Sequence, residues 1–331
     1  MIEPLVSVHM ITYNHAPYIA QAIEGVIQQK VNFPIELVIG EDWSTDGTRE
    51  IVLEYKRKYP DIIRVILSDE NIGGMKNAYR TAKACRGKYI AFCEGDDYWH
   101  RLDKLQKQVD YLETHPECGM VSSDVDIYYD LTKEFKRDYN YSNGFVSDDN
   151  LTIEQVLWGG LSIWTCTVVI RRCLYRRIVE NDPYLYENKN IVLGDLQVWA
   201  ELTKMSRLFY IPETLAVYRV LHESASRSKD RKKELCFLKS ISDIKLYLSE
   251  KYRLPNGFRK KEEETWVHRS LLLALYEKNP SLANEVKKKV DKFTIKNWAR
   301  FLGAKYLVFN YSYRVATIIL HQFKKKQKQW P

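Results

Sequence analysis

Short apolar runs alternate with amphipathic stretches through the first third of the chain. The apolar runs predict buried strands at residues 5–11, 35–39, 62–67 and 89–93. Between them, apolar side chains recur at helical spacing and predict helices at residues 18–29, 51–59 and 75–85. Strands that alternate with helices in this way predict an α/β fold with a mainly parallel central sheet and right-handed crossovers.

The pattern becomes less regular after this part and changes near residue 225. Further helices are predicted at 102–115, 152–157 and 196–205, and further strands at 119–127, 166–170, 207–211 and 215–218. Pro212 marks a turn between the last two strands, and residues 129–150 are polar and predict a loop. Beyond residue 229 only helices are predicted, at 232–252, 258–278, 282–289 and 305–323. We therefore expect one domain at 1–225 and a helical, basic and aromatic C-terminal region at 226–331.

The predicted strand at 89–93 ends in a cluster of acidic residues. Glu94, Asp96 and Asp97 fall within four residues at the carboxyl end of that strand, where open α/β sheets place their ligands. Three close carboxylates repel one another unless a cation lies among them, and a divalent metal with oxygen ligands would provide that cation. The alternative is that Asp96 and Asp97 cap a helix that begins near Leu102.

The loops after the first, second and fourth predicted strands lie at the same edge of a parallel sheet. Tyr13, Asp42 and the Asp96-Asp97 pair are therefore expected to face one crevice. These groups suit a nucleotide diphosphate, because the ring stacks on the base, the lone acid accepts from a base N–H, and a cation neutralises the phosphates. No G-x-G-x-x-G follows the first strand and no G-x-x-x-x-G-K-[ST] occurs, which disfavours dinucleotide and P-loop sites.

Four motifs, in this order, resemble those of the family 2 glycosyltransferases of GT-A fold. They are Val6-Ser7-Val8 through Thr12-Tyr13-Asn14, Glu41-Asp42-Trp43-Ser44-Thr45-Asp46-Gly47-Thr48, Asn71-Ile72-Gly73, and Glu94-Gly95-Asp96-Asp97-Tyr98-Trp99. The resemblance extends over about the first 225 residues and implies a Rossmann-like GT-A sandwich. Two features depart from the family pattern: Glu41-Asp42 replaces the usual acid pair, and Trp43 stands where a small residue is common.

The resemblance implies roles for residues within the matching motifs. Tyr13 would stack on the uracil of the donor and Asp42 would bind the base. Asp96 would contact the ribose, and Asp97 would bind the cation, Mg²⁺ or Mn²⁺. The other motif residues expected at the donor are Thr12, Asn14 and Asn71.

Asp195 directly precedes the predicted helix 196–205 and is therefore expected to cap it. The resemblance implies that an acid at this place is the catalytic base, and a rigid, ionised carboxylate suits that role. The family also carries a basic or histidine element near the diphosphate or the metal, for which Arg219 and His222 are the candidates here. For His222 a purely structural role is the alternative.

The resemblance thus implies an inverting transferase of the hexosyl or N-acetylhexosaminyl class. It would move a sugar from a nucleotide diphosphate, UDP above all, to a hydroxyl of a glycan or lipid-linked acceptor in cell-surface polysaccharide biosynthesis. Two alternatives stay open, a nucleotidyltransferase of related fold and a non-catalytic sugar-binding protein. The first lacks the glycine-rich, basic loop after the first strand that would hold a triphosphate.

Composition adds charge and location to this interpretation. The formal net charge is +8, and lysine runs in the last third form either solvated helix faces or a surface for anionic lipid. No aromatic-basic module indicates a nucleic-acid partner. Six cysteines without a C-x-x-C pair and an amino terminus without a secretory signal predict a cytoplasmic protein, soluble or peripheral. The predicted helix 305–323 fits a membrane interface, or packing on the main domain or on another subunit of a homo-oligomer.

Overall fold

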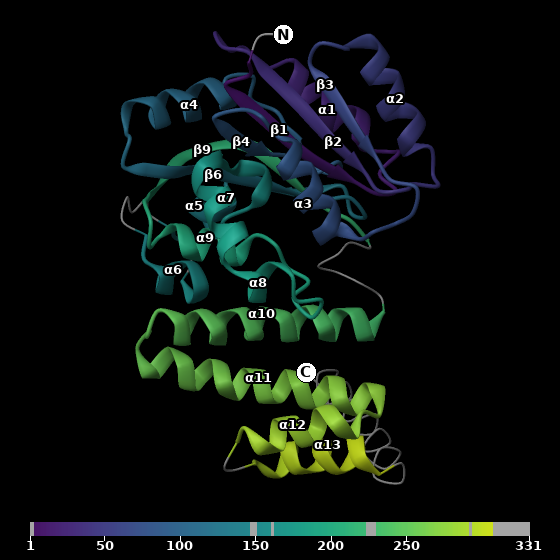
Figure 1. Cartoon of the computed structure of the whole chain (residues 1–331), viewed down its shortest axis with the longest axis vertical. Coiled ribbons are helices and arrows are strands. Elements are labelled where there is room, and N and C mark those ends of the chain that lie inside the picture. The colour runs from purple at the N-terminus through teal and green to yellow at the C-terminus, as the bar shows by residue number, and fades with distance from the viewer. Residues whose placement is uncertain (1–2, 146–150, 160–161, 223–229, 291–292, 307–331) are drawn as a thin grey trace, which may run out of the picture. The chain divides into compact units, whose positions relative to one another are not determined.

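The computed structural model describes residues 3–145, 151–159, 162–222, 230–290 and 293–306. The chain divides into two compact units, one of residues 1–188 and 194–225 and the other of residues 189–193 and 226–331. In Figure 1 the first unit holds the sheet, and the second holds the helices at the yellow end of the colour scale.

The strands of the described chain belong to one mixed sheet. They are β1 (Val6–Thr12), β2 (Ile35–Glu41), β3 (Ile63–Leu67), β4 (Tyr89–Phe92), β5 (Tyr98–Trp99), β6 (Cys118–Tyr129), β7 (Glu134–Lys136), β8 (Val169–Arg171) and β9 (Arg207–Val220). Their order is β3-β2-β1-β4-β8-β6-β9-β5, and β7 pairs with β6. The strands β1 to β4 are mutually parallel, as predicted, and β6 is parallel to β9. Antiparallel β8 joins these two parts, so the sheet is mixed rather than purely parallel.

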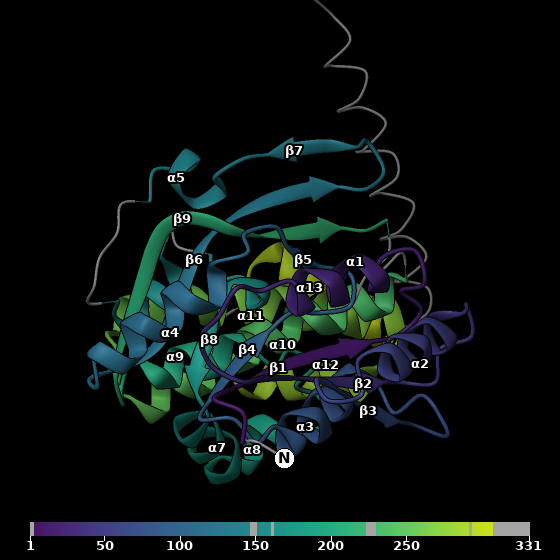
Figure 2. The same ribbon diagram turned by 90° about the horizontal axis from the view of Figure 1, so that it is seen from above.

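Helices connect the strands and cover both faces of the sheet (Figures 1 and 2). They are α1 (Ile19–Ile27), α2 (Thr48–Lys58), α3 (Gly74–Ala84), α4 (Lys104–Thr114), α5 (Tyr139–Ser142), α6 (Ile153–Trp158), α7 (Arg172–Asn181), α8 (Pro183–Tyr186) and α9 (Leu196–Leu202), with a 3₁₀ turn η1 (Thr165–Thr167). Side chains of α1, α2 and α4 pack on one face of the sheet. Side chains of α3, α7 and α9 pack on the other.

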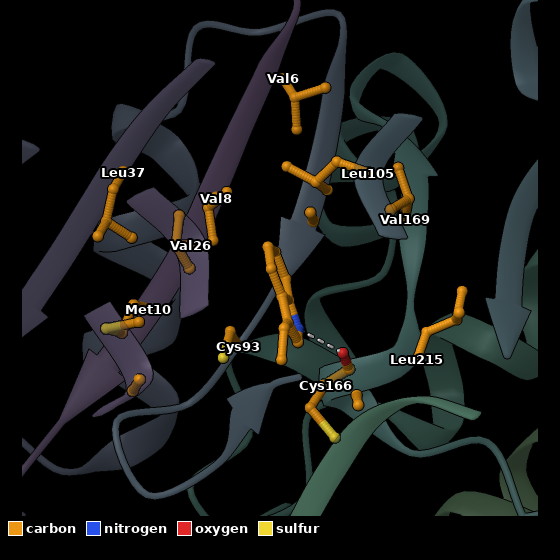
Figure 3. Close-up of a cluster of buried hydrophobic side chains, with 14 of the residues drawn as sticks. Val6, Val8, Met10, Val26, Leu37, Cys93, Leu105, Cys166, Val169 and Leu215 are labelled. Carbon is orange, nitrogen blue, oxygen red and sulfur yellow. Dashed lines mark hydrogen bonds between the residues drawn. The ribbon is translucent and has the colours of Figure 1, made fainter. Parts of the chain in front are cut away.

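The alternation of β1 shows how the sequence builds the first of these faces. Val6, Val8 and Met10 are fully buried and point to the same side. Figure 3 shows them facing Val26 of α1 and Leu105 of α4. Each buried aliphatic side chain of this kind contributes about 1.5–3 kcal/mol, so this core is a main source of the stability of the unit.

The other face of β1 carries His9. Its ring packs 5.2 Å from Phe92, which in turn lies 5.9 Å from Trp199 of α9, ring centroid to centroid. The Nε2 atom of His9 lies 2.9 Å from the carbonyl oxygen of Ala78 in α3. Burial lowers the pKa of His9 to about 4, so this histidine is a neutral core residue at physiological pH.

The strand β9 corrects the prediction of two strands separated by a turn at Pro212. It is continuous, because residues 212 and 213 bulge out of the ladder: Ile211 pairs with Ser123, and Thr214 pairs with the next residue, Asp124. A bulge accepts proline because no ladder hydrogen bond is required of its missing N–H.

Two further predictions are wrong in part, and one alternative is not observed. The loop predicted at 129–150 contains β7 and α5, and the strand predicted at 166–170 is split into η1 and β8. The helices α7 and α8 were not predicted. Asp96 and Asp97 do not cap the following helix, since β5 intervenes and Asp103 occupies the N-cap of α4.

The described part of the second unit consists of helices and connecting loops, with residues 189–193 in irregular structure. It contains α10 (Arg231–Lys251), α11 (Asn256–Glu277), α12 (Pro280–Lys288) and α13 (Ile295–Lys305) around a core that includes Trp266, Leu271, Val286 and Phe301. The first three agree with prediction, α13 was not predicted, and nearly all of the helix predicted at 305–323 lies outside the described residues. Among the described helices, none is long and apolar enough to cross a membrane.

Candidate active site

The loops that follow β1 and β2 are tied together at the carboxyl edge of the sheet. Asn14, whose φ is 55°, donates its backbone N–H to Ser44 Oγ (3.0 Å) and accepts the Thr45 N–H at Oδ1 (2.9 Å). The backbone N–H of His15 donates to Thr48 Oγ1 (2.8 Å). These contacts fix the two loops against each other. Both loops are predicted to hold the donor.

Asp42 is buried at the end of this edge and is held by backbone groups. Its own N–H donates to the carbonyl of Thr12 (3.1 Å), and its carboxylate oxygens accept the N–H groups of Ile72 and Gly73 (2.9 Å each). Asn71 Nδ2 donates to the Asp42 carbonyl (3.3 Å). The structure therefore brings together Thr12, Asp42 and Asn71. The Asp42 carboxylate can still accept a further hydrogen bond, because each of its oxygens can accept two.

Two exposed aromatic rings flank Asp42 on these loops. Tyr13 is 43% exposed and Trp43 is 44% exposed. Trp43 has a φ of 65°, a left-handed conformation that is strained for a bulky side chain. The guanidinium of Arg49 lies 4.9 Å from the Trp43 ring centroid, and its Nε donates to Glu41 Oε2 (2.5 Å). Trp43 is thus an exposed aromatic group, in contact with Arg49, directly after the residue predicted to bind the base.

His15 links this region to the acidic turn after β4. Thr12 Oγ1 lies 3.3 Å from His15 Nδ1, and His15 Nε2 lies 3.9 Å from Asp96 Oδ2. Gly95 donates its N–H to the carbonyl of Ile11 (2.9 Å), and a Cβ at Gly95 would lie 2.6 Å from Thr12 Oγ1. Glycine is therefore required for the acidic turn to approach β1.

The two aspartates of the acidic turn face different surroundings. Asp97 is only 2% exposed, and its Oδ1 accepts the backbone N–H of Arg219 (2.8 Å). The side chain of Asp96 is 17% exposed, and its carbonyl accepts from Arg219 Nε (2.7 Å). Asp97 thus fastens the turn from inside, and Asp96 is the carboxylate open to a ligand.

Arg219 reaches this turn from β9 inside a cage of aromatic rings. Its guanidinium carbon lies 4.6, 5.3 and 5.6 Å from the ring centroids of Tyr18, Tyr98 and Tyr128. Its Nη2 donates to Gln21 Oε1 (2.8 Å). These contacts make Arg219 a positioning residue for the acidic turn, and its predicted contact with a diphosphate stays a prediction.

Asp195 caps α9, as predicted from its position. Its Oδ1 accepts the N–H of Leu196 (2.7 Å), and its Oδ2 accepts the hydroxyl of Thr165 (3.3 Å). Burial raises the pKa of Asp195 above its usual value despite these two hydrogen bonds. The charge of Asp195 also helps to raise the pKa of Glu94, so the predicted base lies within electrostatic reach of the acidic turn.

A second connection joins the acidic turn to the segment that holds Asp195. Trp99 Nε1 donates to the carbonyl of Cys166 (2.8 Å), which Figure 3 draws as the dashed line beside Cys166. Cys166 follows Thr165, whose hydroxyl contacts Asp195. The last residue of the Glu94–Trp99 motif therefore fixes the turn that orients Asp195.

Among the described residues, His15 is the only ion-pair partner of the three acids of this turn, at 3.9 Å from Asp96. Glu94 Oε2 is buried and has no hydrogen-bond partner in the described chain. Burial, together with the charges of Asp96 and Asp195, raises the pKa of Glu94 to about 8. Burial, Asp96 and Glu94 likewise raise the pKa of Asp97 well above its usual value. A bound cation would stabilise the ionised forms of these acids.

These residues fit a metal that is shared with a substrate. No group of three or more His, Cys, Asp or Glu side chains among the described residues is arranged to hold a metal ion. Mg²⁺, however, is usually bound by one or two carboxylates, waters and substrate phosphates. Asp96, which is partly exposed and lies within electrostatic reach of Glu94, is the carboxylate that fits such a site.

The structure gives no support to one predicted site residue, His222, and it adds two residues that were not predicted, His15 and Thr165. His222 is exposed, and no contact joins it to Asp96 or Asp97 in the part of the chain described. Its predicted metal role stays a prediction. His15 and Thr165 were not selected, because their contacts with Asp96 and Asp195 depend on loops that only the fold brings together.

Comparison with known proteins gives a consistent result. A family model described as Glycosyl transferase family 2 matches residues 7–177. An uncharacterised protein of Mycobacterium tuberculosis is 35% identical over 218 residues, which cover 64% of this chain and 58% of that protein. The putative teichuronic acid biosynthesis glycosyltransferase TuaG of Bacillus subtilis is 30% identical over 229 residues, covering 69% of this chain and 83% of TuaG. The chain thus spans 58% of the length of the mycobacterial relative.

Solved structures show the same fold at low sequence identity. S. aureus TarS 1–349 in complex with UDP superposes with a TM-score of 0.55 and 18% identity, covering 94% of this chain and 91% of that one. The mannosyltransferase PcManGT from Pyrobaculum calidifontis, in complex with GDP-Man and Mn²⁺, superposes with a TM-score of 0.53 and 16% identity. The match covers 94% of this chain and 87% of that one. The predicted GT-A fold is confirmed. Because the family model spans the motif-bearing half of the chain and TuaG is matched over most of its length, this chain belongs to glycosyl transferase family 2.

Proposed function

We propose that this glycosyltransferase inverts the anomeric centre as it moves a sugar from a nucleotide diphosphate, UDP above all, to a hydroxyl of a glycan or lipid-linked acceptor. The observation that carries the proposal is that hydrogen bonds join the acidic turn, Glu94 to Trp99, both to the segment of Asp195 and to the loops of Tyr13 and Asp42. TarS in complex with UDP supports a uridine donor, and the name of TuaG supports a role in cell-surface polysaccharide biosynthesis.

Asp195 is the proposed base. A bond forms between the acceptor oxygen and the anomeric carbon while the bond from that carbon to the diphosphate oxygen breaks, and the acceptor proton passes to the Asp195 carboxylate. The raised pKa of Asp195 makes it a better proton acceptor than an ordinary carboxylate. The Leu196 N–H and the Thr165 hydroxyl hold this carboxylate in one orientation.

The donor is proposed to lie across the tied loops and the acidic turn. Tyr13 would stack on the base and Asp42 would accept a base N–H, with Trp43 as a second aromatic wall. Asp96, assisted by Glu94, is the proposed cation-side carboxylate in place of Asp97, because Asp97 is buried against the Arg219 backbone. Bound Mg²⁺ or Mn²⁺ would neutralise charge on the departing diphosphate.

A panel of UDP-hexoses and UDP-N-acetylhexosamines, with Mn²⁺, Mg²⁺ or EDTA, tests the proposal. We expect thermal stabilisation and UDP release with at least one donor, loss of both with EDTA, and a product of opposite anomeric configuration by NMR. Asp96→Asn should weaken donor binding. A product with retained configuration overturns the inverting mechanism, and donor binding without any transfer or hydrolysis favours a non-catalytic sugar-binding protein.

We further propose that the protein works in the cytoplasm, on the cytoplasmic face of the membrane. The lysine runs of the second unit support contact with anionic lipid. Flotation with vesicles containing phosphatidylglycerol at low salt tests this: protein that stays at the bottom has no such affinity. The protein is also proposed to form a homo-oligomer. Gel filtration with light scattering tests this by measuring its molecular mass in solution.

A further inference from the structure

A cavity of about 750 Å³ opens at the edge of the sheet opposite the candidate active site. Its lining includes Pro4 and Leu5 before β1, Pro34 before β2 and Lys88 before β4. These positions are the amino ends of the parallel strands, whereas the acidic turn lies beyond their carboxyl ends. The seven residues of β1 separate the two places by roughly 20 Å. The cavity is therefore distinct from the active site.

The polar part of the cavity is strongly basic. Arg86, Lys88, Arg172 and Arg176 line it, against one acidic residue, Glu3. Four cations around one concave surface attract an anion, because the low-dielectric walls concentrate the electric field of the cations.

Two of these cations carry positive charge that the described residues do not fully balance. Arg172 donates its Nε to the carbonyl of Gly87 (2.5 Å), and no carboxylate of the described chain pairs with it. Arg86 pairs with Glu36 (Nη2 to Oε2, 2.9 Å), but the same carboxylate also pairs with Arg64 (3.0 Å). One carboxylate between two guanidinium groups leaves one positive charge in excess.

The other two cations are available to a ligand. Lys88 pairs with Glu113, and Arg176 pairs with Glu180, in exposed ion pairs. Pairs of this kind are weak and exchange readily for a better partner. The helix α7 also begins at Arg172 with no side chain capping its first N–H groups, which adds to the positive potential.

The remaining lining is apolar. Pro4, Leu5, Phe33 and Pro34 form it, and the volume lies within the range of small-molecule sites. We propose that this cavity binds a phosphate ester, with the phosphate among Arg86, Lys88, Arg172 and Arg176 and the organic part against the apolar lining. The phosphate belongs either to a soluble metabolite or to a lipid headgroup. The proposal is independent of the sugar-transfer chemistry.

Cys173 provides a direct probe, because it lines the cavity and is an exposed free thiol. Its alkylation by the neutral reagent N-ethylmaleimide is followed by mass spectrometry at increasing phenyl phosphate. We expect saturable protection of Cys173, with benzyl alcohol giving none and with Cys236, outside the cavity, unaffected. The lipid arm replaces phenyl phosphate by vesicles of phosphatidylcholine with or without phosphatidic acid.

The decisive variant is the double substitution Arg172→Gln and Arg176→Gln. It should raise the half-protecting concentration at least about tenfold, since charge-assisted hydrogen bonds are lost. Arg177→Gln is the matched control, because Arg177 is exposed on the same helix but does not line the cavity. Protection by phosphatidic acid vesicles alone assigns the phosphate to a lipid. Protection that is equal in the double variant, or absent with both phenyl phosphate and phosphatidic acid, overturns the proposal.

Discussion

Two glutamates at opposite edges of the sheet differ in their hydrogen-bond partners and in the direction in which their pKa is shifted. Glu36, in β2, accepts hydrogen bonds from Ser7 Oγ (2.6 Å), the Arg86 N–H (2.9 Å) and Arg64 Nη1 (3.0 Å). Burial alone would raise its pKa, but these bonds outweigh burial, and the pKa lies below its usual value. Glu94, after β4, has a buried oxygen without a partner and a pKa of about 8.

The difference separates a residue that holds the fold from one that awaits a ligand. At the amino edge the protein supplies every partner that Glu36 needs. At the carboxyl edge, burial and the charges of Asp96 and Asp195 raise the pKa of Glu94, and a donor complex with its cation would bring the missing positive charge. Changes at the two edges should therefore affect different properties.

The largest expected effect is at the carboxyl edge. Asp195→Asn should lower kcat about 10³–10⁴-fold, because an amide cannot accept the acceptor proton, while donor affinity measured by calorimetry stays unchanged. Asp182→Asn is the control, since Asp182 also caps a helix but lies outside the acidic cluster. Near-native turnover of the Asp195 variant would remove it as the base.

At the amino edge, Glu36→Gln should reduce the free energy of unfolding by about 3 kcal/mol, because it leaves two guanidinium groups without their buried partner. Urea unfolding measures this. Glu180→Gln, which breaks an exposed pair, should change stability by less than about 0.5 kcal/mol. An equal effect of the two substitutions would contradict the role given to Glu36.

Between the edges, His9 should make stability depend on pH. Its folded pKa of about 4 lies below its ordinary 6.5, so the unfolded chain binds the extra proton between these values. The full contribution is present above pH 6.5, and about 3 kcal/mol is lost as the pH falls to 4. Urea unfolding at several pH values should show a shallower slope for His9→Gln than for the unmodified protein. Identical slopes would exclude His9 as the cause.

The smallest expected effect on stability is at Glu94, and it gives the clearest contrast with Glu36. Glu94→Gln should not lower the unfolding midpoint at pH 7 in metal-free buffer, because the carboxyl oxygen it replaces has no partner to lose. The same variant should lose donor-dependent stabilisation in Mn²⁺. A fall in the midpoint as large as that of Glu36→Gln would show that Glu94 also holds the fold.

The sequence predicted the half of the sheet that rests on local pattern. The apolar runs of β1 to β4 are each bounded by polar residues or by glycine and proline, so periodicity alone located them. The motif residues Thr12, Asp42 and Asn71 were expected at the donor from the family resemblance, and hydrogen bonds bring these three residues together.

The remainder depends on contacts between distant residues. Asp97 is turned inward by Arg219, 122 positions away, and nothing in Glu94–Trp99 distinguishes it from Asp96. Pro212 was interpreted as a chain break because its neighbours on β6, which absorb it as a bulge, are not local in sequence. Thr165 gained its role only when η1 was placed against Asp195.

The left-handed conformation of Trp43 has a consequence for protein engineering. Altering which substrate an enzyme accepts commonly reduces its robustness. At Trp43 a single substitution would avoid this loss of stability. Trp43→Gly would relax the backbone and at the same time widen the space beside Asp42. A library that begins at Trp43 therefore tests the proposed base site from a more tolerant starting point than the natural chain.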